Sequence, residues 1–156
     1  MKKVILSVAL VLGCLTFANA QQNALGLKYG GEWNNHSTYI SYQRFLSEIS
    51  RLEMNLGVSS FNFDVFTANA IFQRVRQLQE MPYGFKWHFG IGAGVAFGEH
   101  IDFGLSLLGN IGIEYNLHSV PLQLALDYTP SMSITPSFGN THFGEGGARF
   151  SARWRF

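Results

Sequence analysis

Ala148-Arg-Phe-Ser-Ala-Arg-Trp-Arg-Phe156 alternates between two kinds of side chain along its whole length. One set is apolar and contains Phe150, Trp154 and Phe156, whereas the other is mostly arginine and contains Arg149 and Arg153. Only a β-strand places every second side chain on the same face. The stretch therefore predicts a strand with an aromatic face and an arginine face, and the strand is expected to reach the last residue.

The same period of two recurs upstream and predicts seven further strands. It is clearest around residues 84–97, where large apolar side chains alternate with Lys86, His88 and small residues. Two segments are ambiguous: 37–46, in which Arg44 cannot be assigned to a face, and 73–78. Arg74-Val75-Arg76 breaks the alternation there, which a β-bulge or the edge of a membrane would explain. The eight predicted strands are 24–30, 37–46, 50–60, 64–78, 84–97, 101–115, 120–129 and 144–156.

Residues 1–20 have the three parts of an export signal. Lys2 and Lys3 precede a mostly apolar stretch, and Ala18-Asn19-Ala20 forms a small-residue cleavage site. We therefore expect a cleaved signal peptide at 1–20 and a single mature domain at 21–156. Two alternatives are lipidation at Cys14, the single cysteine of the chain, and a membrane-anchoring helix, although the apolar stretch is short for a span.

Composition indicates an outer surface that does not face water. Charged residues make up 13% of the chain and aromatic residues 15%, against about 25% charged residues in soluble domains. Loss of Lys2 and Lys3 would change the net charge from +1 to −1, which offers no footprint for nucleic acid. After residue 20 no run of 18 apolar residues occurs, so a closed barrel is the remaining way to span a bilayer. The predicted fold class is an all-β, eight-stranded antiparallel up-and-down transmembrane β-barrel.

The opposite orientation, a soluble lipocalin-like carrier with apolar side chains inside, has the same alternation. The polar face of residues 84–97 is largely glycine and alanine, which suits a narrow lumen better than a surface in water. Aromatic residues also gather near predicted strand ends, where membrane barrels carry their girdles. These residues are Tyr29, Tyr83, Phe85, Phe97, Tyr115, Tyr128, Trp154 and Phe156.

Over residues 22–156 the chain resembles the small eight-stranded outer-membrane β-barrel proteins of Gram-negative bacteria. The resemblance is carried by Gly84-Phe-Lys-Trp-His-Phe-Gly-Ile-Gly-Ala-Gly94, Gly112-Ile-Glu-Tyr115, Pro121-Leu-Gln-Leu-Ala-Leu-Asp-Tyr128 and Arg153-Trp-Arg-Phe156. It implies a monomer in the cell outer membrane, surrounded by lipid. It also implies that Trp154 and Phe156 form an assembly signal for the barrel-assembly machinery. The fold hosts several activities, so an architecture is implied more strongly than a function.

Charged side chains on the predicted inner face form the candidate site. They are close to balanced in sign, and buried charges must be paired. This favours a lumen plugged by ion pairs over a proton or ion path, and eight strands leave no open channel once side chains fill the interior. Lys28 and Asp127 also face inward. The predicted lumen charge network near the periplasmic end is Arg51, Glu53, Lys86, His88, Glu114, Arg153 and Arg155.

Five histidines raise the alternative of a lipid A-modifying enzyme. His36-Ser37 and His118-Ser119 are sequence neighbours, and neighbours on a strand point to opposite faces, so neither pair is arranged for proton transfer. We therefore predict no catalytic residue, cofactor or metal site. The short connections near 47–49, 79–82 and 118–119 are expected on the periplasmic side. The longest connection, Pro130–Phe143, is expected on the outer side, where it offers a surface for a binding partner.

Overall fold

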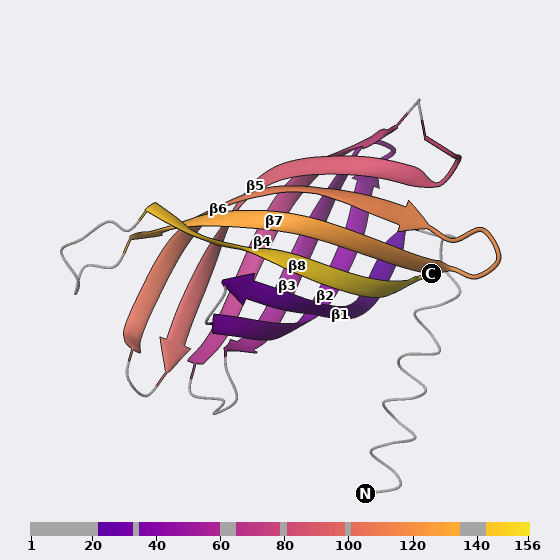
Figure 1. Cartoon of the computed structure of the whole chain (residues 1–156). Helices are drawn as coiled ribbons and strands as arrows, with labels where there is room; N and C mark the ends of the chain where they lie inside the picture. Colours follow the sequence, from indigo (N-terminus) through magenta and orange to yellow (C-terminus); the bar gives the residue numbers. More distant parts are fainter. Residues whose placement is uncertain (1–21, 33–34, 60–64, 79–80, 99–100, 135–142) are drawn as a thin grey trace, which may run out of the picture.

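Eight antiparallel strands form a closed barrel in the computed structural model, which describes residues 22–32, 35–59, 65–78, 81–98, 101–134 and 143–156 (Figure 1). Each strand pairs with its neighbours in the sequence, and β8 returns to pair with β1. The predicted number of strands and the up-and-down order are confirmed. The strands are β1 (Asn23–Glu32), β2 (Asn35–Ser47), β3 (Ser50–Ser59), β4 (Val65–Gln77), β5 (Phe85–Gly98), β6 (Ile101–Asn116), β7 (Leu122–Ile134) and β8 (Phe143–Arg155).

The two ends of the chain meet where the barrel closes. Leu25 of β1 lies opposite Trp154 of β8, and the pairing continues to Gly31 opposite Ala148. Phe156 lies just beyond β8, and its backbone exchanges two hydrogen bonds with Asn23, of 3.0 and 2.9 Å. Closure therefore leaves no strand edge unpaired, which is what a sheet needs in order to lie in hydrocarbon.

The apolar face of the sheet points outward and the polar face points inward. Leu56 and Ile91 are 63% and 75% exposed, whereas Arg51 and Glu53 are 0% and 1% exposed. A lipocalin-like carrier would have the reverse arrangement, with an apolar cavity and a polar exterior. The soluble-carrier alternative is therefore wrong for this structure, because the inside of the barrel is its polar side.

β4 is regular throughout, contrary to the predicted break at Arg74-Val75-Arg76. Val75 is buried opposite His88, while Arg74 and Arg76 are exposed and point outward, as does Arg44 on β2. The pairing of β4 with β3 and with β5 runs on without a bulge. Side chains still alternate between inward and outward here, but arginine occupies the outward positions, which are apolar earlier in the strand.

β7 extends beyond its predicted end at residue 129. Pro130 pairs with Gly146 of β8, and the strand continues to Ile134. Proline cannot donate a ladder hydrogen bond, and the pairing of β7 with β6 is interrupted between Tyr128 and Ser131. The connection from β7 to β8 is therefore 135–142 and not Pro130–Phe143. Tyr128, predicted near a strand end, lies in the middle of β7.

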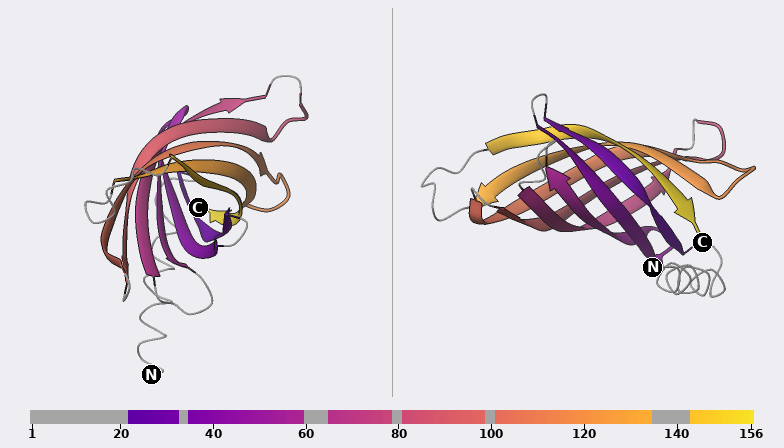
Figure 2. Two further views of the ribbon diagram at one scale, coloured as in Figure 1. Left: turned by 60° about the vertical axis from the view of Figure 1, so that its left-hand side comes forward. Right: turned by 90° about the horizontal axis from the view of Figure 1, so that it is seen from below.

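The N-terminal end of β1 and the C-terminal end of β8 lie at the same end of the barrel (Figure 2). β2, β4 and β6 also end here, next to the predicted short connections, and we call it the terminal end. Among the described residues no helix is long and apolar enough to span a membrane. The predicted signal peptide at 1–20, Cys14 included, lies outside the described residues.

Candidate functional site

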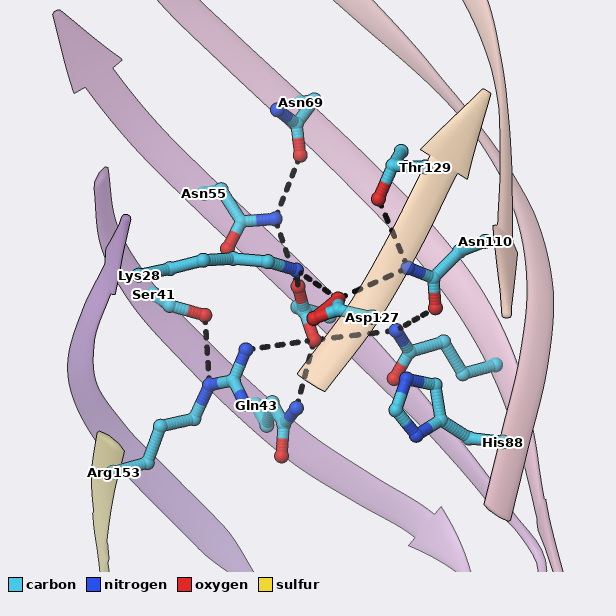
Figure 3. A network of polar contacts seen from close by, with 12 residues as sticks. Lys28, Ser41, Gln43, Asn55, Asn69, His88, Asn110, Asp127, Thr129 and Arg153 are labelled. Atoms are coloured by element: carbon cyan, nitrogen blue, oxygen red, sulfur yellow. Dashed lines mark hydrogen bonds and ion pairs between the residues drawn. The ribbon is translucent and has the colours of Figure 1, made fainter. Parts of the chain in front are cut away.

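Glu53 of β3 is the centre of a polar network that crosses the lumen. Figure 3 labels several residues of this network, among them Lys28 and Arg153. Its Oε1 atom accepts hydrogen bonds from Lys28 Nζ at 2.7 Å and Asn55 Nδ2 at 3.0 Å. Its Oε2 atom accepts from Gln43 Nε2 at 2.7 Å, Arg153 Nη2 at 3.1 Å and Gln73 Nε2 at 3.2 Å. Two cations and three amides from β1, β2, β3, β4 and β8 therefore converge on one carboxylate.

Lys28 links this centre to the opposite wall of the barrel. Its Nζ atom lies 2.7 Å from Asp127 Oδ1 on β7 as well as 2.7 Å from Glu53. Asn110 of β6 closes the circuit, because its Nδ2 atom donates to Asp127 Oδ1 and to Thr129 Oγ1. Its Oδ1 atom accepts from Gln73 at 2.7 Å. The network thus joins strands on opposite sides of the barrel, and not only neighbours in the sheet.

A second ion pair lies nearer the terminal end. Arg51 Nη1 is 2.6 Å from Glu114 Oε2, and Arg51 Nε donates to Gln73 Oε1 at 2.6 Å. His88 Nδ1 lies 3.6 Å from the same Glu114 oxygen, beyond hydrogen-bond distance. Arg51 also places its guanidinium 5.5 Å from the centre of the Phe45 ring. Gln73 connects this pair to Glu53, so the two parts form one network.

Charges in the network are balanced. Lys28, Arg51 and Arg153 are paired with Glu53, Glu114 and Asp127, and all six side chains are at most 3% exposed. Burying an ion costs several kcal/mol unless close partners compensate it, and here each ion has an opposite charge within 3.1 Å. Such an arrangement links opposite walls of the barrel across the lumen.

The structure brings together five of the seven predicted network residues: Arg51, Glu53, His88, Glu114 and Arg153. Lys86 and Arg155 instead line two hollows of about 510 and 320 Å³ at the terminal end. They lie on the inward face, as predicted, but closer to the mouth than to the network. Trp154, the first residue of the predicted assembly signal, is 52% exposed on the outer wall.

Sequence reasoning missed the neutral members of the network. Gln43, Gln73 and Asn110 carry hydrogen bonds between the charged groups, and Gln123 Oε1 accepts from Arg153 at 3.4 Å. The signal was available, since Gln73 lies two residues from Ile71 and Val75 on a buried face. These amides carry no charge, so a network predicted from the charged inward residues did not include them. An amide both donates and accepts hydrogen bonds and can therefore bridge ions of either sign.

The histidines do not form a hydrolase site within the described residues. His36 is at the start of β2 with its ring outward, while Ser37 is buried on the other face. His118 is exposed at the terminal end, 5.1 Å from the Tyr83 ring, and is thus separated from His36 by the length of the barrel. His100 and His142 lie outside the described residues.

Comparison with solved structures finds membrane barrels of similar architecture. The N-terminal β-barrel domain of Pseudomonas aeruginosa OprF aligns with a TM-score of 0.60 and 12% identity, over 88% of this chain and 100% of that one. The Yersinia pestis outer membrane protein Ail aligns with a TM-score of 0.52 and 14% identity, over 88% and 100%. A de novo designed transmembrane β-barrel aligns with a TM-score of 0.60 and 10% identity, over 88% and 98%. At these identities the likeness concerns the fold.

No protein-family model matches the chain, and no curated protein matches it. The predicted architecture, a closed eight-stranded antiparallel barrel, is confirmed, and its fold is similar to those of outer-membrane barrels.

Proposed function

We propose that this chain is an integral outer-membrane β-barrel protein with a filled lumen, whose role is structural or surface-interacting rather than catalytic or pore-forming. The observation that carries the proposal is the network around Glu53, in which fully buried side chains from opposite walls meet. A fixed, charge-balanced network leaves no continuous path for ions, whereas porins of 16–18 strands keep an aqueous channel.

An exterior made of apolar side chains supports the membrane location. Leu27, Leu56 and Ile91 are more than half exposed, which is costly in water and favourable in hydrocarbon. The likeness to outer-membrane barrels supports the choice of the outer membrane. In this proposal the protein is a monomer surrounded by outer-membrane lipid, and Trp154 and Phe156 serve as the assembly signal for the barrel-assembly machinery. The export signal at 1–20 would bring it there.

Membrane insertion is tested by gel mobility in SDS, with and without boiling, on the membrane fraction of cells that make the full chain. A closed barrel resists SDS until it is heated, so we expect two mobilities and retention in the membrane after carbonate extraction. Boiled protein is the unfolded reference. A single mobility, with the protein in the soluble periplasmic fraction, would contradict the proposal.

Closure of the lumen is tested by current recordings across planar bilayers, using protein from a sample that has shown the heat-dependent shift. We expect no stable current steps, whereas a 16-stranded porin recorded in the same cell gives them. Reproducible current steps from the heat-modifiable protein would show that the lumen network opens, but they would not contradict the membrane barrel.

The enzyme alternative is tested by the lipid A mass spectrum of cells lacking the protein. That alternative predicts a changed spectrum, and we expect no change.

A further inference from the structure

Three arginines interrupt the apolar outer wall of the barrel, all near the terminal end. Arg44 lies on β2, and Arg74 and Arg76 lie on β4, with exposed side chains that point away from the lumen. Among the side chains that the structure describes, no other charged residue faces outward from the strands. We call these three residues the outer arginine patch.

The three positions are close together in the sheet. Arg44 lies opposite Leu52 of β3, Leu52 lies opposite Phe72 of β4, and Arg74 follows Phe72 by two residues on the same face. With neighbouring strands about 4.8 Å apart and residues about 3.3 Å apart along a strand, the backbones of Arg44 and Arg74 are separated by about 12 Å. Long arginine side chains from these sites can reach one common ligand.

Apolar side chains lie on both sides of the patch. Toward the middle of the barrel the wall continues with Met54 and Phe72, which are 40% and 42% exposed. Toward the terminal end, Leu46 and Ile49 are 58% and 47% exposed. The guanidinium groups therefore lie close to the terminal border of the apolar wall, with apolar side chains still around them. That position corresponds to the headgroup region of a bilayer, where charged outward residues are tolerated, in contrast to the midplane.

No described acid neutralises the patch. Arg44, Arg74 and Arg76 make no ion pair within the described residues, and Glu53, Glu114 and Asp127 are all engaged in the lumen. Glu48, in the turn between β2 and β3, lines the mouth of the lumen together with Lys86 and Arg155. Among the described side chains, the outer wall thus presents three positive charges and no negative ones. A second copy of the chain would bring more arginines, and no described acid of its outer wall, to this patch.

We infer that the outer arginine patch is a binding site for a phospholipid with a net negative headgroup, in the leaflet at the terminal end of the barrel. The guanidinium groups would bind the headgroup phosphate with paired N–H donors, and Met54 and Phe72, on the mid-barrel side of the patch, would contact its acyl chains. Because the terminal end is the periplasmic end in barrels of this kind, the leaflet is the periplasmic one. This inference rests on the proposed membrane location and adds a specific lipid partner to it.

The experiment is native mass spectrometry of the purified, heat-modifiable full-length protein in detergent micelles, with equal amounts of phosphatidylglycerol and phosphatidylcholine added. We expect wild-type protein to retain phosphatidylglycerol in preference to phosphatidylcholine. Each basic residue near an anionic lipid contributes about a fivefold preference, so the variant R44Q/R74Q/R76Q should lose most of it. Added salt should weaken the preference, because the charges are exposed.

The matched control is Lys86→Gln, which removes one positive charge at the same end but from the inward face. It should keep the wild-type lipid preference, whereas Arg74→Gln alone should lower it by about fivefold. R44K/R74K/R76K keeps the charge but loses the paired N–H donors, so it should retain part of the preference and exceed the triple glutamine variant. If the triple glutamine variant does not give the heat-dependent shift, the single Arg74→Gln and Lys86→Gln variants decide the question.

Equal retention of both lipids by wild-type protein, or the same loss in Lys86→Gln and Arg74→Gln, would overturn the lipid site. Neither result would affect the membrane barrel itself, because every sample is first selected by its heat-dependent mobility. Failure of wild-type protein to show that shift would instead overturn the proposed membrane function.

Discussion

Glu53 is the residue on which the interior of the barrel depends most. Its two oxygens accept five hydrogen bonds, two of them from the fully buried cations Lys28 and Arg153. Removing one partner of a buried ion pair is more damaging than replacing the whole pair, because the remaining ion is left without compensation. Arg153 would keep only its bonds to Ser41 and Gln123, both neutral.

We predict that Glu53→Ala lowers the free energy of unfolding by about 3–5 kcal/mol. The measurement is urea unfolding of the barrel in lipid vesicles, followed by tryptophan fluorescence. Glu48→Ala is the control, because it removes an exposed acid from the neighbouring turn, and it should change the free energy by less than about 0.5 kcal/mol. Equal effects of the two substitutions would mean that the lumen network contributes little to stability.

Among the elements, β2 and β3 illustrate how large and small residues are matched inside the barrel. Tyr39 of β2 lies opposite Gly57 of β3 and is 5% exposed, and the Arg149 guanidinium is 5.1 Å from its ring centre. A Cβ atom at Gly57 would lie 2.2 Å from Tyr39 Cδ1 and 2.8 Å from the Thr38 carbonyl oxygen. Glycine is therefore required at 57 by the ring that covers it.

We predict that Gly57→Ala destabilises the barrel by about 1–3 kcal/mol, because Tyr39 must shift in a filled interior. Gly94→Ala serves as the control. Its nearest neighbours would be Ser106 Oγ at 3.0 Å and Asn69 Cβ at 3.1 Å, so a small adjustment suffices. Both variants are compared by the urea midpoint at which the heat-dependent mobility is lost. A smaller effect at 57 than at 94 would contradict the packing argument.

The pattern of the strands was largely predictable from sequence, and its exceptions have physical causes. Arg74 and Arg76 obscured the alternation in β4, because a positive charge was not expected on the apolar face. Pro130 ended the predicted seventh strand, because proline supplies no ladder donor, whereas the barrel continues through it after a local break in the β6–β7 pairing. In both strands, pairing with the neighbouring strands maintains the β-structure through residues that are unfavourable for a single strand in a membrane.

At the scale of the whole molecule, closure of the barrel does not depend on the side chain of Phe156. The backbone N–H and C=O of Phe156 bond to Asn23, and any residue could supply these groups. If the terminal aromatic is an assembly signal, as proposed, its side chain acts during insertion and contributes less to the folded barrel. Assembly and stability can then be separated by one substitution.

We predict that Phe156→Ala reduces the amount of heat-modifiable barrel in the membrane fraction of cells several-fold. The protein that does fold, or that is refolded from urea into vesicles, should lose no more than about 1 kcal/mol of unfolding free energy. Leu117→Ala, in a connection at the same end, is the control and should assemble normally. A parallel loss of assembly and of stability in Phe156→Ala would assign the side chain a structural role only.

The sequence by itself determined the number of strands and, outside 37–46 and 73–78, which side chains face inward, because a period of two follows from the geometry of any single strand. It also identified Arg51, Glu53, His88, Glu114 and Arg153 as inward residues near one end. Only the tertiary structure decided which groups meet. Lys28 reaches both Glu53 and Asp127 because barrel closure places β1, β3 and β7 around one narrow lumen, and a contact between opposite walls depends on the register of every pairing between them.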